Sequence, residues 1–347
     1  MRALCLTATG GPEHLTLIDG LPAPALSRPD HVRVGVRAVG LNHLDLWVAN
    51  GIPAVPIRDF PHIVGSDGAG VVLETGPAVD GLRPGDRVVI NPGVSCGTCE
   101  ACRAGEEVFC RRFGVLGEHT PGTAAEEIVL PARNLRPITG EWGWPAAAAF
   151  TLSTLTAWRM LTTRAGLKAG ESVLIWGIGG GVAIAALQIT RHLGARAAVT
   201  SSSPAKLRAA AALGAELGID HEQTPDVAGP LKEHFGGRAD VVVDSVGTAT
   251  WARSLQALAP GGRLVCCGAT TGHDAGIDLR RLYWFQWSLL GSTMGTSREF
   301  ADVVALGNTG ALRPPIDSVR PWTEARAAYR RMAAHEQFGK LVLEVTP

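Results

Sequence analysis

The segment Val173-Leu174-Ile175-Trp176-Gly177-Ile178-Gly179-Gly180-Gly181-Val182-Ala183 decides the fold class of this chain. It begins as a short apolar run, continues through closely spaced glycines and ends in small apolar residues. Glycine permits the tight turn that joins a buried strand to a helix, and it lets backbone amides approach an anion at the positive end of that helix. We therefore predict a strand from Ser172 to Trp176, a turn over the glycines and a helix from Val182 to His192.

The same alternation of strand and helix continues toward the C-terminus. Short apolar bursts are typical of buried parallel strands, and the segments between them have helical periodicity. The predicted strands are Ala197–Thr200, Glu216–Ile219, Asp240–Val246, Arg263–Gly268 and one near Ser288–Met294, and the predicted helices are Pro204–Leu213 and others near Trp251–Leu258 and Glu299–Leu306. This pattern predicts an α/β fold with a doubly wound parallel sheet of the Rossmann type.

In this context the glycine turn is a candidate site for the pyrophosphate of a dinucleotide. The turn residues that we expect to bind it are Gly177, Gly179, Gly180, Gly181 and Val182. A strand before the turn and a helix after it are the setting that such a site requires. The alternative is a flexible glycine loop that closes an unrelated α/β unit. The segment departs from the usual pattern at Ala183, where a third glycine is commoner but alanine is tolerated.

The end of the second predicted strand bears on which nicotinamide cofactor binds. An NAD site usually offers a carboxylate to the ribose 2′-hydroxyl there, but no acid occurs before Glu216. Ser201, Ser202 and Lys206 instead present hydroxyls and a cation, which suit a 2′-phosphate. We therefore expect NADPH, with NADH as the alternative cofactor. Ser203-Pro204 also fits the start of the next helix, in which case Lys206 is solvated; both interpretations can hold at once.

Residues 1 to about 135 have a different pattern, of short strands broken by glycine and proline. Period-two alternation at His31–Val36 and helical periodicity around Asn42–Asn50 predict a small, mostly antiparallel β domain with one helix. The tail from Pro321 to Val345 contains a helix and a last strand, Lys340–Leu343, which we expect to return to this domain.

Four cysteines lie within fifteen residues, at Cys96, Cys99, Cys102 and Cys110. This spacing lets one short loop surround a tetrahedral ion, and four thiolates leave no open position for substrate, so we expect a structural Zn²⁺. An iron–sulfur cluster and disulfides are the alternatives. The predicted β domain offers no electron-transfer context for a cluster, which favours zinc.

Length, charge and cysteine use limit the remaining possibilities. A chain of 347 residues is long for one core and predicts two domains. Lys plus Arg and Asp plus Glu are both 32, and no basic block occurs, which argues against nucleic acid and membrane surfaces as partners.

The apolar stretch Pro145–Leu161 is interrupted by Arg159 and is expected to be one buried helix. An odd count of 7 cysteines suits a reducing cytoplasm.

The whole chain resembles the medium-chain dehydrogenase/reductase superfamily, which contains zinc-type alcohol dehydrogenases and quinone reductases. The resemblance rests on Gly40–Asp45, Gly65–Gly70, the cysteine lobe and Gly177–Ala183. It implies a GroES-like β domain formed by 1–148 with 311–347, including a zinc lobe at 93–112. It also implies a Rossmann domain at 149–310, with the active site in the cleft between the two domains.

The chain departs from the zinc-dependent branch of this family at the catalytic metal. The family's ligand positions correspond to Asn42, Ser66 and a residue near Leu152, and its proton-relay hydroxyl corresponds to Leu44. Asparagine, serine and leucine do not make a zinc site. An improvised site that uses His43 or His62 with Asp67 has no recognisable spacing. We therefore expect that the structural metal is retained and that the catalytic metal is lost.

Without a Lewis acid, hydride addition to a simple ketone lacks its main stabilisation of the alkoxide, whereas a conjugated acceptor spreads the charge into an enolate or hydroquinone oxygen. Asn42, accompanied by Asp45, is the candidate catalytic group that holds this oxyanion. The alternative is that Asn42 only caps the helix that follows it, with Asp45 in the first turn.

The resemblance also implies further cofactor contacts and an assembly. The implied cofactor residues are Thr156, Val246, Gly268, Ala269, Ser292 and Met294. Lys340 is expected to be solvated rather than to reach a phosphate. The uncharged strand Ser288–Met294 is expected to pair with its copy in a homodimer or tetramer. The alternative is a monomer in which the C-terminal tail or the loop Thr271–Leu282 covers this edge.

The sequence thus predicts a zinc-free, NADPH-dependent oxidoreductase acting on a small molecule, a quinone, enone or enoyl thioester. One alternative is an alcohol dehydrogenase with an atypical metal site. A third is a non-catalytic NADPH-binding protein. Fold and motif do not identify the substrate.

Overall fold

The computed structural model describes residues 1–346, which form two compact units. One unit consists of Met1–Leu152 and the segment from Gly295 onward, and the other is Ser153–Met294. This division differs from the expected boundaries mainly at 295–310, which packs with the first unit. The reason is a set of hydrogen bonds from Asn308, whose Oδ1 accepts from Thr139 N at 3.0 Å and from Trp142 Nε1 at 3.1 Å.

The second unit is built on a six-stranded sheet in the order β13-β12-β11-β14-β15-β16, and all neighbouring strands are parallel. The strands are β11 (Ser172–Ile175), β12 (Arg196–Ser201), β13 (Leu217–Asp220), β14 (Ala239–Asp244), β15 (Leu258–Cys266) and β16 (Ser288–Gly291). The order reverses between β11 and β14. In such sheets ligands bind beyond the carboxyl ends of the strands at this reversal.

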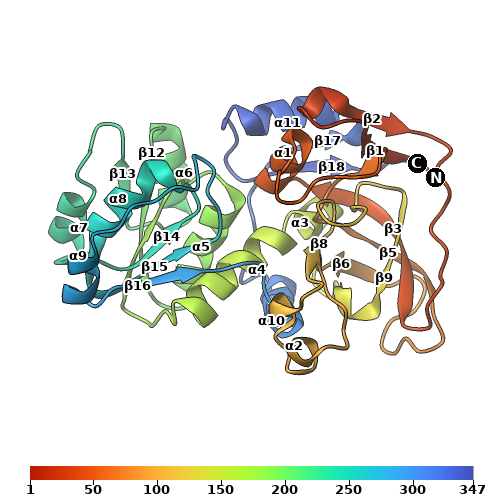
Figure 1. Cartoon of the computed structure of the whole chain (residues 1–347), viewed down its shortest axis with the longest axis horizontal. Helices are drawn as coiled ribbons and strands as arrows, with labels where there is room; N and C mark the ends of the chain where they lie inside the picture. Colours follow the sequence, from red (N-terminus) through yellow and green to blue (C-terminus); the bar gives the residue numbers. More distant parts are fainter. Residues whose placement is uncertain (347) are drawn as a thin grey trace. The chain divides into compact units, whose positions relative to one another are not determined.

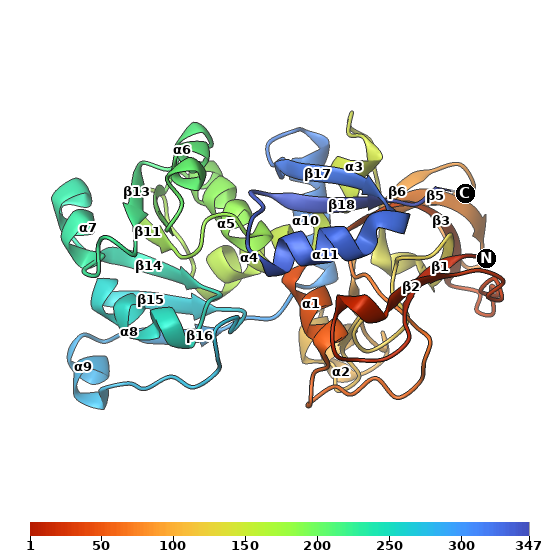
Figure 2. The same cartoon turned by 90° about the horizontal axis from the view of Figure 1, so that it is seen from above.

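Helices cover both faces of this sheet. They are α5 (Gly181–His192), α6 (Pro204–Ala212), α7 (Ala228–Phe235), α8 (Thr248–Ala257) and α9 (Leu279–Trp284). Helices α5 and α6 lie on one face and α8 lies on the other (Figure 2). The glycine turn and most strands agree with the predicted positions within a few residues, whereas α7 and α9 were not predicted.

The apolar stretch 145–161 was expected to form one helix, and that prediction is wrong. The chain forms α3 (Trp144–Ala148), then α4 (Thr151–Arg159), then a π-helical turn (Met160–Arg164). Ala149 and Phe150 separate the two helices, and the last turn of α3 closes on Ala149, whose N–H donates to Pro145 O at 3.0 Å. Among the described residues, no helix is long and apolar enough to span a membrane.

The first unit contains a larger, mainly antiparallel sheet and two small ones (Figure 1). The larger sheet has the order β10-β6-β5-β3-β18-β17, with β9 also paired to β3. Its strands are β3 (His31–Gly40), β5 (Ala69–Thr75), β6 (Arg87–Ile90), β9 (Glu127–Pro131), β10 (Leu135–Pro137), β17 (Ile316–Pro321) and β18 (Lys340–Glu344). The C-terminal strand β18 pairs antiparallel with β3, as predicted for the tail.

The small sheets and the helices complete this unit. One small sheet has the order β2-β1-β4 and the other pairs β7 with β8. Their strands are β1 (Ala3–Leu6), β2 (Leu15–Ile18), β4 (His62–Ile63), β7 (Gly93–Val94) and β8 (Gly114–Val115), and the remaining helices are α1 (His43–Asn50), α2 (Glu100–Arg103), α10 (Ser297–Asn308) and α11 (Ala325–Ala333).

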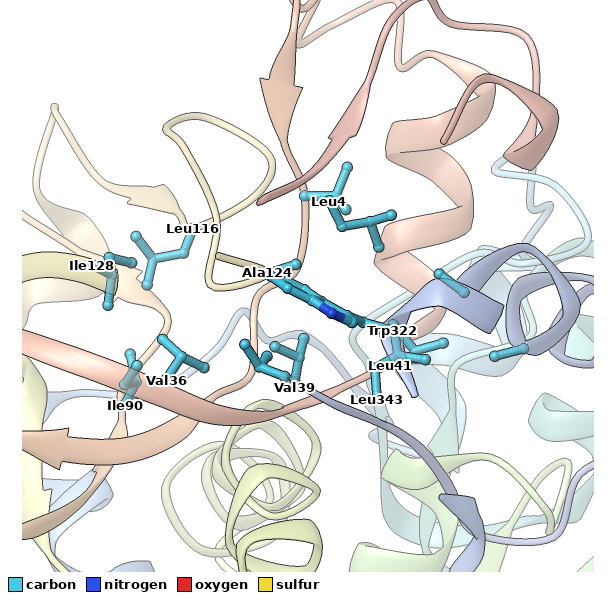
Figure 3. Packing of buried hydrophobic residues seen from close by; sticks show 14 of the residues in the cluster. Leu4, Val36, Val39, Leu41, Ile90, Leu116, Ala124, Ile128, Trp322 and Leu343 are labelled. Atoms are coloured by element: carbon cyan, nitrogen blue, oxygen red, sulfur yellow. The ribbon is translucent and has the colours of Figure 1, made fainter. Parts of the chain in front are cut away.

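The core of the first unit lies against the large sheet. Valines 32, 34 and 36 of β3 and Leu343 of β18 are completely buried, as the strand pattern requires. Figure 3 shows Trp322 among Val39 and Leu41, at the end of β3, and Ala124, which precedes β9. The C-terminal segment therefore closes the core that the N-terminal strands begin.

Candidate functional site

Sheet register brings three polar residues together at one end of the first unit's large sheet. Val342 of β18 lies opposite Gly40 of β3, and Leu41 N–H donates to Leu341 O at 2.9 Å. Continuing this antiparallel register places Lys340 beside Asn42. On the other side of β3, Ala38 lies opposite Ala69, which places the preceding Asp67 near the same strand end. Asn42, Asp67 and Lys340 thus meet because β5, β3 and β18 are neighbours.

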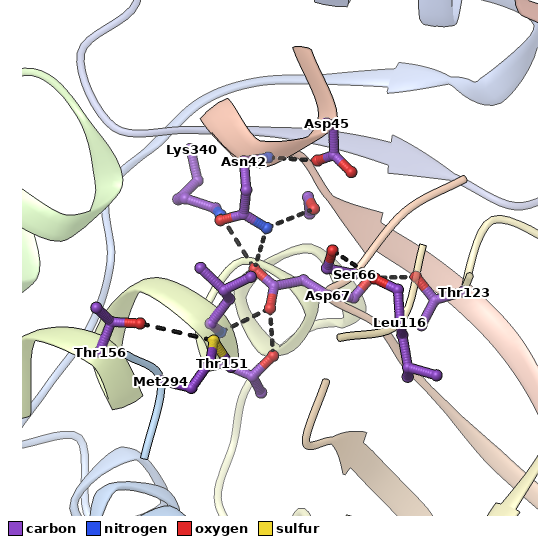
Figure 4. A network of polar contacts seen from close by, with 12 residues as sticks. Asn42, Asp45, Ser66, Asp67, Leu116, Thr123, Thr151, Thr156, Met294 and Lys340 are labelled. Carbon is purple, nitrogen blue, oxygen red and sulfur yellow. Dashed lines mark hydrogen bonds and ion pairs between the residues drawn. The ribbon is translucent and has the colours of Figure 1, made fainter. Parts of the chain in front are cut away.

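Asp67 is the centre of this cluster and is completely buried. Its Oδ1 accepts from Thr151 Oγ1 at 2.5 Å and from Leu152 N at 2.6 Å, at the start of α4. Its Oδ2 accepts from Asn42 Nδ2 and from Lys340 Nζ, both at 3.0 Å (Figure 4). Four donors therefore occupy the lone pairs of this carboxylate, so it has no free position for a metal ion.

Asn42 joins the cluster to helix α1. Its Oδ1 accepts from Lys340 Nζ at 2.6 Å, and its Nδ2 also donates to Gly40 O at 3.4 Å. Its backbone N–H donates to Asp45 Oδ2 at 2.7 Å, so Asp45 binds the residue at the helix N-terminus. Asn42 is thus the N-cap residue of α1 and forms a capping box with Asp45, and its side chain also reaches Asp67 and Lys340.

Asp45 is a buried carboxyl beside this cluster. Burial raises the pKa of Asp45 to about 7, whereas the Asn42 N–H and the Lys340 charge act in the opposite direction. Nearby, burial and the Asp45 charge raise the pKa of the Tyr329 phenol well above its ordinary value. The Tyr329 hydroxyl has no hydrogen-bond partner in the described part of the chain. This buried region of the first unit therefore disfavours added negative charge, except where Lys340 compensates it.

The other polar residues near the family's metal positions have separate partners. Ser66 Oγ donates to Leu116 O at 2.7 Å, and His62 Nε2 lies 2.9 Å from Gly117 O. The His43 ring stacks on that of His335 with centroids 6.1 Å apart, and burial lowers the pKa of His43. Within residues 1–346, the only group of three or more metal-ligating side chains is the cysteine cluster. The improvised zinc site with Asp67 is therefore not formed.

Lys340 is where the sequence interpretation was wrong. It was expected to be solvated, but it is only 3% exposed and forms an ion pair with Asp67 at 3.0 Å. Thr151, another partner of Asp67, was not singled out either. The available signal was a lysine at the head of an apolar strand, directly after Gly339. Buried lysines require a partner, which the sequence did not identify.

In the second unit, the glycine turn has the geometry of a phosphate-binding turn. Gly177 and Gly179 have φ values of 68° and 150°, which side-chain-bearing residues rarely adopt. Ile178 N–H donates to Thr200 O at 2.8 Å, which ties the turn to β12, and α5 begins at Gly181. A Cβ at Gly180 would meet nothing within 4 Å, so the backbone is open there. The fit of a pyrophosphate to this turn is therefore good.

The other predicted cofactor residues follow the carboxyl ends of the strands in the same unit. Val246 comes after β14, Gly268 and Ala269 come after β15, and Ser292 comes after β16. Thr156 Oγ1 lies 3.8 Å from Met294 Sδ, and both residues are 5% exposed (Figure 4). Met294 has a positive φ of 48°, an unusual conformation for a residue with a side chain.

The residues predicted to select the cofactor lie at the end of β12. Ser202 is exposed, whereas Ser201 is 6% exposed and its Oγ accepts from Ser203 N–H at 3.1 Å. Lys206 is in the first turn of α6, where its backbone N–H donates to Ser203 Oγ at 3.4 Å. The acid nearest in the sheet is Asp220, opposite Ser201, and its Oδ1 accepts from two backbone N–H groups of its own turn.

The four cysteines predicted as metal ligands come together in one loop. Their sulfur atoms all lie within 4.8 Å of one another, and all seven cysteines of the chain are free of disulfides. Backbone N–H groups donate to Cys96 Sγ from Thr98 at 3.4 Å and from Cys99 at 3.3 Å. Such donors favour thiolate over thiol. Four converging sulfurs with amide support fit a tetrahedral ion such as Zn²⁺.

Comparison with known families assigns this architecture. Residues 28–140 match the alcohol dehydrogenase GroES-like domain, and residues 181–309 match the zinc-binding dehydrogenase family. The chain belongs to the medium-chain dehydrogenase/reductase superfamily. It is therefore an oxidoreductase with a GroES-like domain and a Rossmann-type domain, from a family whose members use nicotinamide cofactors.

Several known proteins are similar to this chain over nearly its whole length. An NAD-dependent alcohol dehydrogenase of Sulfolobus acidocaldarius is 30% identical, with 100% of both chains covered. A crotonyl-CoA carboxylase/reductase of Cereibacter sphaeroides is 31% identical, over 93% of this chain and 82% of its own length. The spectinabilin polyketide synthase system protein NorB of Streptomyces orinoci is 36% identical over 97% of this chain, but the chain spans only 14% of NorB.

A solved structure supports the same assignment. The crystal structure of an NAD-dependent alcohol dehydrogenase is 41% identical and covers 100% of both chains, with a TM-score of 0.94. Alcohol dehydrogenases and a crotonyl-CoA carboxylase/reductase are thus both similar to this medium-chain dehydrogenase/reductase. Membership in the superfamily does not separate these two chemistries, so the side chains at the site must.

Proposed function

We propose that this chain is an NADPH-dependent reductase of activated carbon–carbon double bonds that works without a catalytic metal. The observation that carries the proposal is the hydrogen bonding of the Asp67 carboxylate. Its carboxylate accepts from four donors, and one of them is the buried ammonium of Lys340. An internal cation therefore already neutralises the acid beside the family's metal position.

The chemistry follows from what these groups offer a substrate. When bound, NADPH supplies a hydride. Adding that hydride to a simple carbonyl concentrates negative charge on one oxygen, which favours a strong Lewis acid. Adding it to the far carbon of an enone, quinone or enoyl thioester delocalises the charge, so hydrogen-bond donors suffice. Asn42 offers a second Nδ2 hydrogen, whose bond to Gly40 O is long at 3.4 Å. We assign Asn42 as the oxyanion donor, with Asp45 fixing its backbone.

The preference for NADPH rests on the residues at the end of β12. Ser202 is exposed, and Lys206 lies in the first turn of the following helix. The Oδ1 atom of Asp220 accepts a hydrogen bond from the backbone N–H of Glu222 in the turn that follows β13. A hydroxyl and an ammonium suit a 2′-phosphate, whereas a ribose 2′-hydroxyl would favour a free carboxylate.

We further propose that Cys96, Cys99, Cys102 and Cys110 hold one structural Zn²⁺. The sulfurs converge within 4.8 Å. Zinc bound to four thiolates has no open coordination position, so it would stabilise the loop and take no part in the reaction.

A substrate screen combined with metal analysis tests the proposal. NADPH oxidation is measured with benzoquinone, cyclohexenone, crotonyl-CoA and butanal, and zinc is measured by mass spectrometry on the same preparation. We expect turnover of at least one conjugated acceptor, little reduction of butanal, and one zinc per chain. Two metals per chain, or a clear preference for butanal, would overturn the zinc-free mechanism.

The second candidate is an alcohol dehydrogenase. The observation that favours it is the 41% identity with a solved NAD-dependent alcohol dehydrogenase. Under this alternative a second metal must displace Lys340 from Asp67, because that carboxylate otherwise has no free position. Ethylenediaminetetraacetate treatment would then abolish aldehyde reduction at once, rather than slowly through loss of the structural metal.

A further inference from the structure

Lys340 and Asp67 form a buried ion pair whose presence the stability of the fold does not explain. Their side chains are 3% and 0% exposed. The free energy needed to remove two charges from water is about as large as the attraction between them in the protein interior. A protein with two apolar side chains of similar volume in their place is therefore often equally stable. A buried lysine and aspartate at the site are therefore better explained by a use of the charge than by folding.

The distances show which neighbour the ammonium approaches most closely. Lys340 Nζ lies 2.6 Å from Asn42 Oδ1 but 3.0 Å from Asp67 Oδ2. Asp67 already accepts from Thr151, Leu152 and Asn42, which are neutral donors at 2.5–3.0 Å. The ammonium is thus directed at the amide oxygen of Asn42 as well as at the carboxylate.

A cation that is hydrogen-bonded to the oxygen of an amide polarises that amide, so its N–H groups become stronger hydrogen-bond donors. Hydrogen bonds in a chain polarise one another, and the effect is larger when one donor is charged and water is absent. In Asn42, one Nδ2 hydrogen is directed to Asp67, and the other has only the 3.4 Å contact with Gly40 O. That second hydrogen is the one a substrate oxygen can take.

We propose that Lys340 is a positioning residue which, through the amide of Asn42, stabilises the negative charge that develops on the substrate oxygen. The inference rests on the proposed function. When bound, NADPH would supply a hydride to the far carbon of the acceptor and would become NADP⁺. The negative charge that then develops on the substrate oxygen would accept the Asn42 hydrogen bond. A proton from water at carbon would complete the saturated product and leave hydroxide.

The backbone around Lys340 is built to hold this residue in one place. Gly339 has a φ of 104°, and a Cβ on it would collide with Pro315 O. Lys340 N–H donates to Pro315 O at 2.9 Å, so the strand β18 begins tightly against β17. The Cα atom of Lys340 is therefore held in place in the large sheet of the first unit, which limits the positions that its ammonium group can reach.

The test compares variants that separate charge from folding. Lys340→Met alone would leave the buried Asp67 carboxylate without a counter-charge, so the informative variant is Lys340→Met/Asp67→Asn. In this variant both charges are lost, and the introduced amide can donate to Asn42 once the Asn42 amide turns its oxygen toward residue 67. Lys340→Arg keeps the charge, and Lys232→Met, at an exposed lysine of α7, is the control. For the best substrate of the wild type we expect kcat to fall about 10²-fold in the double variant, with KM nearly unchanged. Lys340→Arg should recover at least tenfold of that loss.

A second readout does not require turnover. Binding of 4-nitrophenol is followed by its absorbance, because the phenolate absorbs at longer wavelength than the phenol. We expect the NADP⁺-loaded wild type and Lys232→Met to bind the phenolate form, and the double variant to bind the neutral phenol. Equal phenolate binding in all variants, or a folded double variant with wild-type kcat, would overturn the role of Lys340. Turnover of aldehydes alone would instead contradict the proposed function while leaving the Lys340 comparison valid.

Discussion

A single buried carboxyl gives this protein a pH dependence that can be measured. Burial raises the pKa of Asp45 from 3.8 to about 7. A carboxyl whose pKa is raised in the folded state binds its proton more tightly there than in the unfolded chain. Its contribution to stability is complete below about pH 4 and is lost as the pH rises through about 7. Asp45 is thus a residue whose ionised form destabilises the fold at neutral pH.

We predict that Asp45→Asn becomes progressively more stable than the wild type as the pH rises. The asparagine oxygen can still accept from Asn42 N–H, but it carries no charge. The difference in free energy of unfolding should grow by about 2–3 kcal/mol between pH 5 and pH 8. Urea titrations across this range measure it, with Asp80→Asn, in an exposed loop, as the control. A difference that stays constant or shrinks with pH would contradict the raised pKa.

A second residue-scale prediction concerns the cofactor. Lys206→Ala should raise the KM for NADPH while leaving the KM for NADH nearly unchanged. A charge-assisted contact with a 2′-phosphate contributes about 1–3 kcal/mol, which is roughly a 5- to 150-fold change in KM. Steady-state kinetics with both cofactors measures this, and Lys168→Ala, outside the β12–α6 turn, is the control. An equal loss for both cofactors would show that Lys206 serves the fold instead.

For single residues, the sequence indicated which side chains belong to the candidate sites better than it indicated which side chains they contact. Asn42 was singled out because it occupies a family ligand position, and the four cysteines because of their spacing. Lys340 was misjudged because its burial depends on register: β18 must pair with β3 to place it beside Asn42. Pairing between strands about 300 residues apart leaves no local signal.

The elements that carry the cofactor were the most predictable, and the connecting helices were the least. Strand β11 and helix α5 follow directly from an apolar run and a glycine turn. By contrast, α7 (Ala228–Phe235) contains Gly229 and Pro230, which argue against a helix, yet Leu231 is completely buried. Tertiary packing therefore overrides local propensity there. The break between α3 and α4 was missed because both helices are rich in apolar residues and the two residues between them, Ala149 and Phe150, are apolar as well.

The cysteine lobe is the element whose loss should separate stability from activity. We predict that Cys99→Ser loses the metal and lowers the midpoint of thermal unfolding, while turnover per folded molecule changes less than threefold. Metal analysis, calorimetry and active-site titration measure the three quantities. Cys5→Ala, on β1 and outside the cluster, should keep the metal. A Cys99→Ser protein that is stable but inactive would show that the metal takes part in the reaction.

The lobe also contacts another element of the same unit, which extends this prediction. Ser297 N–H, at the start of α10, donates to Glu107 Oε2 at 3.3 Å, and Arg136 donates to Ser297 O at 3.3 Å. Glu107 lies between the third and fourth cysteines. In Cys99→Ser, hydrogen exchange should therefore rise in the lobe and in the first turn of α10, and not in β18.

At the scale of the whole molecule, the two-unit organisation was predictable because two different patterns of strand and helix occupy different parts of the sequence. The boundary near residue 310 was placed by analogy, whereas hydrogen bonds of Asn308 join 295–310 to the first unit. Such contacts between 137–142 and residue 308 cannot be read from periodicity. The oligomeric state also belongs to this scale, and we expect the edge strand β16 to determine it.

The last prediction is that two copies of the chain pair through β16. This strand bonds to β15 on one side, and among residues 1–346 no strand pairs with its outer edge. It carries no charge, and beside it in sequence α9 exposes Leu279, Tyr283 and Trp284, which are 64%, 69% and 76% exposed. An open apolar edge strand invites aggregation, and pairing with its own copy about a two-fold axis removes that edge.

Light scattering at micromolar concentration should therefore give about twice the mass of one 36.3 kDa chain. Leu290→Lys places a charge on β16 and should shift the protein toward the monomer, whereas Leu73→Lys, at an exposed leucine of the other unit, should not. A wild-type mass of one chain would refute the dimer. A dimer that is unaffected by Leu290→Lys would keep the assembly but place its interface elsewhere, because a buried lysine at a paired edge cannot be accommodated without a partner charge.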